Sequence, residues 1–335
     1  MVAERTRWKF KAQRALIEWF DQHRRPLPWR VDRNPYAIWL SEIILQQTRV
    51  EQGLPYWEKF MAEFPTVHDL ADSSQERVLQ TWAGLGYYSR ARNLHRAAQL
   101  LASLPEWPQT AEGWQELPGV GPYTAAAISS ICFGARVPAL DGNAFRVYSR
   151  LFAYTDPVDR PAAHRFFHVE ALLLLDPQRP GDSNQAIMDL GSNICTPTQP
   201  NCEACPLQSF CEAHRRGIPT ELPIKTPKKA ALSMDLPLYV TLHQGHVAMV
   251  QRPGSGIWAG LWCFPETPVE GIPYHLGLRT VHLLSHRKLH IDFLEAEMDI
   301  RAILPEGLHW IAVKDIAHKG IPVPVRWWLK EKNYI

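Results

Sequence analysis

The chain has 335 residues, which is enough for two or three domains that each bury a hydrophobic core. Its formal net charge of +2 neither requires nor excludes a nucleic-acid partner, because such binding depends on where the basic residues cluster. No stretch approaches the roughly eighteen uninterrupted apolar residues of a membrane span, and no apolar segment follows the basic N-terminus as it would in a secretion signal. These features predict an intracellular protein without a membrane partner.

Residues 8 to 215 have the apolar spacing of amphipathic helices and lack strand-like alternation. The clearest helical stretches are Trp8 to Phe20, Ile38 to Gln47, Val78 to Trp82 and Leu94 to Leu104. Turn signals such as Pro26-Leu27-Pro28 and Asp141-Gly142-Asn143 divide this part into short helices. The pattern predicts an all-helical first domain over residues 1–215.

The composition changes after Cys211. Residues 216–230 are basic and punctuated by proline, which predicts an interdomain linker. Beyond it, Leu236 to Val250 and His290 to Met298 carry the β-branched or alternating apolar residues of strands. We therefore expect an α+β second domain over residues 231–335.

Four of the six cysteines fall within seventeen residues, with the spacing C-x6-C-x2-C-x5-C: Cys195, Cys202, Cys205 and Cys211. A disulfide framework is not expected in an intracellular chain, so this crowding indicates a metal site. Zinc sites are usually built from two separated C-x2-C pairs, whereas this run has one pair flanked by single cysteines. The spacing therefore favours a 4Fe-4S cluster, which can also staple a loop that has little core of its own.

The segment from Leu117 to Ala125 predicts a tight turn that leads into a helix with Pro122 in its first turn. Gly119 and Gly121 allow a sharp turn and a close approach of the backbone, and exposed N–H groups at such a place suit a DNA phosphate. By itself this pattern is more typical of an ordinary helix-helix turn. Asp141, about twenty residues further on, completes a helix-hairpin-helix and aspartate pattern.

The hairpin, Asp141 and the cysteine loop, in this order, resemble the endonuclease III superfamily of DNA glycosylases over roughly residues 28 to 211. Three segments resemble the MutY-type adenine DNA glycosylases in particular: Pro28-Trp29-Arg30, Trp39 to Thr48, and Gly84-Leu85-Gly86-Tyr87-Tyr88. The resemblance implies a monomeric base-excision-repair enzyme that removes adenine mispaired with 8-oxoguanine or guanine in double-stranded DNA. Its expected place is the cytoplasm, on the nucleoid in a bacterium.

The same resemblance implies how the first domain is divided. A six-helix module covers about residues 30–140, and the N-terminal helix joins residues 141–215 in an iron-sulfur module. The fold class is thus multidomain, with an all-α helix-hairpin-helix glycosylase domain that carries the iron-sulfur loop and an α+β domain after it.

Breaking an N-glycosidic bond requires an acid for the leaving base and a carboxylate that stabilises an oxocarbenium-like sugar. Glu42 lies in an apolar stretch, where desolvation favours the protonated form, and it matches the family's general acid, which protonates adenine at N7. Asp141 is a good helix N-cap, and the resemblance implies that it stabilises the sugar cation or bonds to it transiently. The sequence leaves both options open. Asn143 is implied to hydrogen-bond Asp141 and keep it ionised.

Tyr123 distinguishes the class of glycosylase. At this hairpin position the bifunctional relatives have a lysine that attacks the sugar and forms a Schiff base, which a phenol cannot form. The resemblance therefore implies a monofunctional glycosylase in which Tyr123 contacts the catalytic carboxylate or the sugar. Plain helix packing is the alternative role for this tyrosine.

Adenine inside a duplex must be flipped out before it can be cleaved, and the gap must be filled. Gln47 and Tyr87 match the family's intercalating residues, a role that suits a flat ring and an amide. Arg30 and Gln185 match the residues that read the flipped adenine. Four further residues are candidates for contact with the DNA backbone, although solvated helix faces explain most such charges: Arg90, Arg92, Arg146 and Arg150.

Residues 231–335 resemble the MutT-like, Nudix-fold C-terminal domain of these enzymes, through Arg252-Pro253, Gly256 to Trp262 and Phe264-Pro265-Glu266. The Glu-rich metal-binding helix of a MutT-type hydrolase does not follow Pro265, so we expect lesion recognition without hydrolysis. Leu284-Ser285-His286 stands in place of the family's Phe-Ser-His reader of 8-oxoguanine. Ser285 and His286 can hydrogen-bond the lesion, whereas leucine lacks the aromatic stacking surface.

Two alternatives remain open. One is an endonuclease III-like glycosylase/lyase for oxidised pyrimidines, against which Tyr123, Glu42, Gln185 and the second domain argue. The other is a non-catalytic helix-hairpin-helix DNA-binding protein with a structural metal site. The presence of both Glu42 and Asp141 argues against it.

Overall fold

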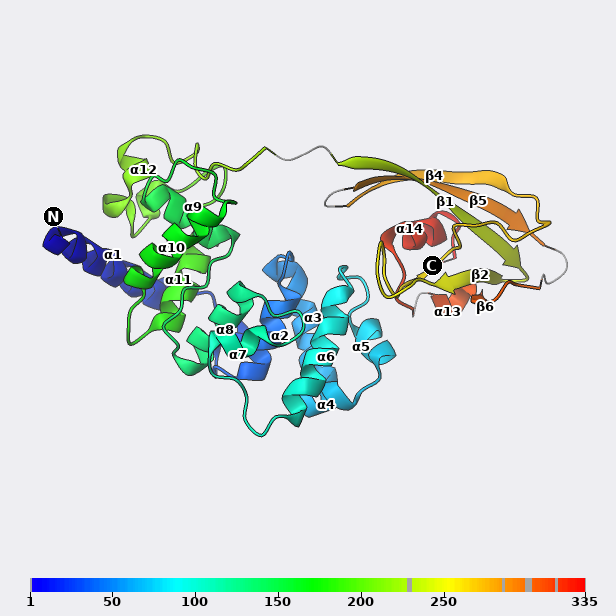
Figure 1. Ribbon diagram of the computed structural model, residues 1–335, viewed down its shortest axis with the longest axis horizontal. Coiled ribbons are helices and arrows are strands. Elements are labelled where there is room, and N and C mark those ends of the chain that lie inside the picture. The colour runs from blue at the N-terminus through cyan, green and yellow to red at the C-terminus, as the bar shows by residue number, and fades with distance from the viewer. Residues whose placement is uncertain (1, 228–230, 285–286, 299–302, 317–318, 335) are drawn as a thin grey trace. The chain divides into compact units, whose positions relative to one another are not determined.

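The computed structural model describes residues 2–227, 231–284, 287–298, 303–316 and 319–334. The chain forms two compact units (Figure 1): Met1–Ala71 with Arg96–Pro227, and Asp72–His95 with Lys228–Ile335. The division after Pro227 falls inside the predicted linker, whereas no sequence signal separates Asp72–His95 from the neighbouring helices. None of the described helices combines the length and apolar character needed to cross a membrane.

Helices make up the described part of the first unit and of residues 72–95, as the apolar periodicity predicts. Their bounds are α1 Val2–His23, η1 Pro28–Arg30, α2 Pro35–Ile44, α3 Val50–Glu63, α4 Val67–Asp72, α5 Gln75–Thr81, α6 Ser89–Ser103, α7 Ala111–Gln115, α8 Pro122–Phe133, α9 Gly142–Leu151, α10 Pro161–Leu174, α11 Pro180–Asn193, η2 Cys202–Ala204, η3 Gln208–Phe210 and α12 Glu212–Arg215.

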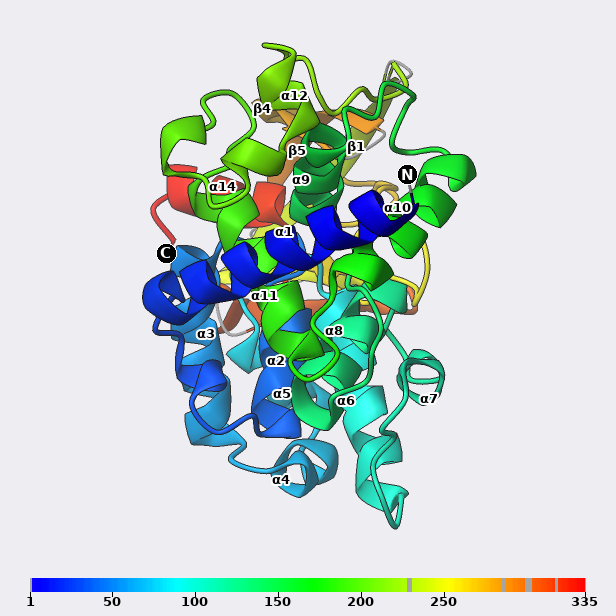
Figure 2. The ribbon, with the colours of Figure 1, turned by 90° about the vertical axis from the view of Figure 1, so that its left-hand side faces the viewer.

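Helix α11 is the centre of the first unit. It packs against α1, α8 and α9, and Figure 2 shows α1 running across it. Two glycines permit the close approach: a Cβ at Gly181 would lie 2.6 Å from the Cα of Ile131 on α8, and a Cβ at Gly191 would lie 2.6 Å from the Cβ of Asn143 on α9. Both distances are shorter than real contacts allow, so the helix spacing depends on glycine.

Asn184 of α11 fixes the segment that connects α8 to α9. Its amide nitrogen donates to Ser130 Oγ and to the carbonyl of Val137, each at 2.9 Å, and its amide oxygen accepts from the N–H of Ala139 at 3.0 Å. Because the side chain is buried, these bonds leave little freedom to the chain that leads into Asp141.

The first part of the predicted linker is packed on the first unit. Leu222 is buried in a small cluster with Ala153 and Ala213. The N–H of Val158 donates to the carbonyl of Ile224 at 3.0 Å, and Asp159 accepts from the backbone N–H and hydroxyl of Thr226, each at 3.0 Å.

The second unit contains one mixed sheet with the order β3-β2-β1-β5-β4, and β6 also pairs with β2. Strands β1 and β5 are parallel, with Leu232 opposite Arg287 and Leu242 opposite Glu297, and the other described pairs are antiparallel. The bounds are β1 Leu232–His243, β2 His246–Gln251, β3 Trp262–Cys263, β4 His275–Leu283, β5 Arg287–Glu297, β6 Leu308–Ala312, α13 Val313–Ile316 and α14 Val323–Glu331.

The core of this sheet lies on the face that α14 covers (Figure 1). Alternate residues of β5, Leu289, Ile291 and Phe293, are fully buried there, and Trp328 of α14 packs on Phe293. The alternation predicted for residues 290–298 is therefore confirmed, as is the α+β character of this part.

Substituting Gly181 by alanine tests the role of close helix packing. The added methyl group would meet the backbone of α8, which cannot rotate away as a side chain could, so we expect the free energy of unfolding to fall by about 1–3 kcal/mol. Gly142→Ala is the control, because its Cβ would enter open space. Urea denaturation measures both, and equal stabilities would contradict the packing argument.

Candidate active site and cysteine pocket

Glu42 lies on α2, whose other residues are almost all buried, and the side chain itself is only partly accessible. The pKa of Glu42 is raised to about 7: burial is the main cause and the negative charge of Asp141 adds to it, whereas the hydroxyl of Tyr123 and the charge of Arg30 lower it. Because Asp141, Tyr123 and Arg30 each change the pKa of Glu42, their side chains lie near its carboxyl group. A carboxyl group with this pKa can donate a proton near neutral pH.

Asp141 occupies the N-cap position of α9, as the sequence predicts. One carboxyl oxygen accepts from the N–H of Ala144 at 2.7 Å, and the other accepts from the Asn143 amide at 2.8 Å. Burial raises the pKa of Asp141 above its ordinary value, while these hydrogen bonds lower it. The predicted bond between Asn143 and Asp141 is therefore present, and it favours the ionised form.

Tyr123 lies on the first turn of α8, one residue after Pro122. Its hydroxyl donates to Met188 Sδ at 3.7 Å. Burial and the neighbouring carboxyl groups of Glu42 and Asp141 raise the pKa of Tyr123 well above its ordinary value, so the phenol stays neutral. Tyr123 is thus packed between helices and is also part of the carboxyl site.

Arg30 is held by a carboxylate that sequence reasoning missed. Asp189 of α11 is fully buried, and its oxygens accept from Arg30 Nη1 at 2.7 Å and Nη2 at 3.1 Å, and from Arg25 Nε at 2.6 Å. The Arg30 guanidinium is therefore oriented through α11. The only sequence signal was an acidic residue one helical turn after Gln185.

Gln185, also on α11, is 7% exposed, and its side-chain amide has no hydrogen-bond partner among the residues that the structure describes. The amide nitrogen and oxygen are not fully enclosed and keep contact with solvent. Its donor and acceptor are therefore available to a ligand that enters the site.

The hairpin between α7 and α8 has the predicted form. Gly119 has φ of +81°, which favours glycine, and its carbonyl accepts from Gln46 Nε2 at 3.3 Å. Gly121 is the N-cap of α8, and a Cβ built there meets no atom within 4 Å. The chain therefore presents an open backbone surface at a helix N-terminus, which suits a phosphate.

Gln47 and Tyr87 have left-handed backbone conformations, with φ of +56° and +47°. Helix α2 consequently ends at Ile44, three residues earlier than the apolar pattern predicts. Both side chains are exposed, so neither is packed in the core.

The four arginines considered as contacts for the DNA backbone differ in their burial. Arg150 is 2% exposed and donates to the carbonyls of Leu222, Thr196 and Pro197, and Arg90 is also buried. Neither the expected contact with the DNA backbone nor the alternative of a solvated helix face fits these two buried side chains. Arg92 and Arg146 are partly buried.

Arg146 connects the site to the cysteine loop. Its Nη2 donates to Asn143 Oδ1 at 2.8 Å and to the carbonyl of Gly191 at 2.7 Å, while its Nε donates to the carbonyl of Cys195 at 2.8 Å. A chain of hydrogen bonds therefore runs from Asp141 through Asn143 and Arg146 to Cys195.

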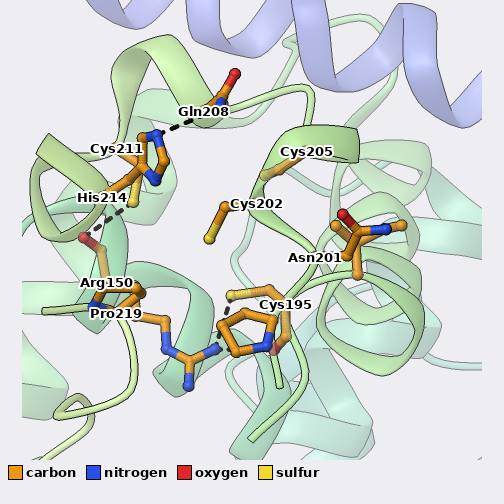
Figure 3. Close-up of a pocket in the computed structure, with 11 residues that line it drawn as sticks. Arg150, Cys195, Asn201, Cys202, Cys205, Gln208, Cys211, His214 and Pro219 are labelled. Atoms are coloured by element: carbon orange, nitrogen blue, oxygen red, sulfur yellow. Dashed lines mark hydrogen bonds between the residues drawn. The ribbon is translucent and has the colours of Figure 1, made fainter. Parts of the chain in front are cut away.

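The four clustered cysteines line one pocket, together with Arg150, Gln208 and His214 (Figure 3). Arg150 Nη1 donates to Cys195 Sγ at 3.2 Å, and the Cys211 thiol donates to the carbonyl of Arg150 at 3.4 Å. In Figure 3 the sulfur atoms of Cys195 and Cys202 are directed toward each other across the pocket. The remaining cysteines, Cys132 and Cys263, are apart from it.

The spacing of these thiols bears on the metal they could hold. Among the described residues, no three His, Cys, Asp or Glu side chains form a site for a single metal ion. Four thiols that line one pocket supply the donor set of a 4Fe-4S cluster, whose irons are held by cysteine thiolates. The residues present therefore fit the cluster that the spacing favours.

The predicted lesion-reading loop joins β4 to β5. Leu284 is partly buried against the core of the sheet, and its N–H donates to the carbonyl of Arg287 at 2.8 Å. Ser285 and His286 lie outside the described residues, so their predicted role stays a prediction.

Comparison with known proteins agrees with this architecture. Residues 40–167 match the HhH-GPD superfamily of base excision DNA repair proteins, and residues 238–331 match the NUDIX domain family. Among solved structures, a thermostable thymine-DNA glycosylase has a TM-score of 0.57 at 26% identity and covers 63% of this chain and 98% of its own. Endonuclease III in a non-covalent DNA complex, with a TM-score of 0.52 at 22% identity, covers 61% and 94% and shows the shared fold.

The fold and the carboxyl site define a DNA glycosylase of the helix-hairpin-helix class that acts in base excision repair. The adenine DNA glycosylase of Rattus norvegicus is 34% identical over 396 aligned residues, which cover 94% of this chain and 76% of the relative. The chain belongs to the MutY-type adenine DNA glycosylase family.

The raised pKa of Glu42 makes stability depend on pH. Below about pH 4.5 the Glu42 carboxyl group is protonated in the folded and in the unfolded protein. Between pH 4.5 and 7 the unfolded protein loses this proton while the folded protein keeps it, so the free energy of unfolding falls as pH rises. We expect Glu42→Gln to remove this pH dependence and to raise the free energy of unfolding by about 1–3 kcal/mol relative to wild type between pH 5 and 8. Glu58→Gln, an exposed glutamate on α3, is the control. A pH-independent effect of Glu42→Gln in urea denaturation would contradict the assignment.

Proposed function

We propose that this glycosylase excises adenine mispaired with 8-oxoguanine or guanine, and that it does so without lyase chemistry. The observation that carries the proposal is the meeting of Glu42, whose pKa is raised to about 7, with Asp141 and a tyrosine in one buried site. The likeness to adenine DNA glycosylases over most of the chain supports the choice of base.

Glu42 is the proposed general acid. Near neutral pH a substantial fraction of its carboxyl groups carries a proton, which it transfers to adenine N7 as the bond between N9 and the sugar C1′ breaks. The electron pair of that bond leaves with the base. Burial thus supplies the protonation state that an exposed glutamate would not have.

Asp141 is the proposed partner of the sugar. Its hydrogen bonds from Ala144 and Asn143 favour a carboxylate, whose negative charge stabilises the cation that develops at C1′. Water then adds to C1′ and gives its proton to the Glu42 carboxylate, which releases an abasic site. Tyr123 cannot form a Schiff base, so no strand cleavage follows.

Gln185 and Arg30 are proposed to recognise the flipped base. The unpartnered amide of Gln185 can offer both a donor and an acceptor to the Watson–Crick edge of adenine. Arg30, fixed by Asp189, gives the pocket a positive charge with little freedom to move. Gly119 and Gly121 would hold a DNA phosphate, and Gln47 and Tyr87 would fill the gap in the duplex.

The cysteine pocket is proposed to hold a 4Fe-4S cluster through Cys195, Cys202, Cys205 and Cys211. The cluster, when bound, would cross-link a loop that contains only short helical turns. The second unit is proposed to read the lesion opposite adenine through Ser285 and His286, with Leu284 beside them.

The central experiment is single-turnover release of adenine from duplexes that hold A opposite 8-oxoguanine, G or T. We expect release from the first two only, and a loss of about a hundredfold or more in Glu42→Gln, since a general acid contributes on this order. Glu58→Gln should match wild type.

Protein with the visible absorption of a bound cluster but no release from any duplex would overturn the adenine assignment. Release from oxidised pyrimidines instead would favour the glycosylase/lyase alternative. Binding to DNA without any base release would favour the non-catalytic alternative.

Replacing Arg150 tests the cluster. Its guanidinium donates to Cys195 Sγ and to four carbonyls of the loop and linker. Arg150→Met should therefore lower the iron content of purified protein to roughly half or below, because partners of metal ligands are typically worth about ten- to hundredfold in metal affinity. Arg165→Met, an exposed site on α10, is the charge-matched control. Unchanged iron content in Arg150→Met would contradict this role.

A further inference from the structure

The loop between α5 and α6 has an unusual backbone. Gly84, Gly86 and Tyr87 all have positive φ, at +98°, +76° and +47°. Glycine adopts such angles readily, but a tyrosine does so only when its surroundings favour it. The Tyr87 side chain is also 55% exposed, so burial of its ring does not explain the conformation.

Arg90, the second residue of α6, contacts the Tyr87 ring from below the surface. Its guanidinium carbon lies 5.4 Å from the Tyr87 ring centroid and 5.0 Å from the centroid of Trp82, which is fully buried. Arg90 itself is 8% exposed. Cation–π contacts are stronger when the cation is shielded from water in this way.

The same guanidinium is bound to the backbone of the loop. Arg90 Nη2 donates to the carbonyls of Leu85 at 3.5 Å and Gly86 at 3.4 Å, which are long bonds. Trp82 Nε1 donates to the carbonyl of Gly86 at 2.8 Å, and the N–H of Arg90 donates to the carbonyl of Tyr87 at 2.9 Å. The turn that presents Tyr87 is thus held by Trp82 and Arg90.

Burial lowers the pKa of Arg90 to about 10, which leaves the guanidinium protonated at neutral pH. A charged group held inside the fold, with donors directed to loop carbonyls, is not placed to bind a DNA phosphate. Its planar shape allows it to contact a ring and bind carbonyls at once, which a lysine could not do.

We propose that Arg90 is a positioning residue for Tyr87: it holds the ring in the orientation in which it enters the base stack. The inference rests on the proposed function, because it takes Tyr87 as the wedge that fills the gap left by the flipped adenine. A wedge ordered before binding loses less conformational entropy when it separates two base pairs. Arg90 therefore acts on the rate of base flipping through Tyr87 and does not touch the adenine.

The test is a double-mutant cycle with Arg90→Met, Tyr87→Ala and the combined variant, assembled with the full chain and its cluster. The duplex holds A opposite 8-oxoguanine, with 2-aminopurine next to the adenine, and stopped-flow fluorescence reports unstacking at saturating protein. Single-turnover adenine release is measured in parallel. Arg96→Met, an exposed arginine on the same helix, is the charge-matched control.

We expect Arg90→Met to slow unstacking about tenfold in the wild-type background and by less than about twofold when Tyr87 is alanine, since coupled residues are not additive. Arg96→Met should leave the rate unchanged. Equal effects of Arg90→Met in both backgrounds, or no effect in either, would overturn the inference. Wild type that gives no fluorescence change on binding would overturn it as well, because Tyr87 would then not be a wedge.

Arg90→Lys covers the case in which the methionine variant folds poorly. It keeps the charge and much of the stem but loses the planar fork, so it should slow unstacking severalfold, again only when Tyr87 is present. Melting temperatures identify variants that fail for structural reasons. Normal unstacking by wild type without adenine release would instead count against the proposed function while leaving the role of Arg90 testable by fluorescence.

Discussion

The close packing of α11 is the constraint on which the rest of the first unit depends. Gly181 and Gly191 let this helix approach α8 and α9 more closely than any side chain would permit. The same helix supplies Asn184, which fixes the chain before Asp141, and Asp189, which fixes Arg30. The positions of the carboxyl groups and of the base-reading residues are thus consequences of one helix and its neighbours.

Burial raises the pKa of both carboxyl groups of the site, but their hydrogen bonds differ. Glu42 accepts few compensating hydrogen bonds, so desolvation dominates and its pKa rises to about 7. Asp141 is also buried, but two donors on α9 stabilise its charged form. Similar groups in one pocket are therefore suited to opposite tasks, one to give a proton and the other to face a cation.

Much of this site could be predicted from the sequence, because its signals are local. The cysteine spacing, the Gly119 turn and the N-cap at Asp141 each depend on residues close together in the chain. Arg150 shows the limit: its position on a helix suggests a solvated charge, whereas its partners lie in segments 45 to 72 residues away. Asp189 was missed for the same reason, since its partners Arg25 and Arg30 precede it by 164 and 159 residues.

Backbone conformation was the other part that the sequence did not disclose. The pattern of apolar residues continues helix α2 to Gln47, but the structure ends it at Ile44 and gives Gln47 a left-handed turn. Tyr87 likewise follows Gly84 and Gly86, yet nothing in the amino-acid sequence indicates that the tyrosine itself has positive φ. Both exceptions fall on residues with an expected role in opening the duplex, where local rules of helix formation are overridden.

The packing of residues 222–226 on the first unit has a practical meaning for dissecting the chain. Leu222 supplies both a buried side chain and the carbonyl that receives Arg150 Nε, and Ile224 and Thr226 pair with Val158 and Asp159. Cutting the chain at residue 215, where the helices end, would remove these partners and leave a buried arginine short of an acceptor. A first unit prepared alone should therefore extend through Pro227, since most of the apparent spacer belongs to the domain that precedes it.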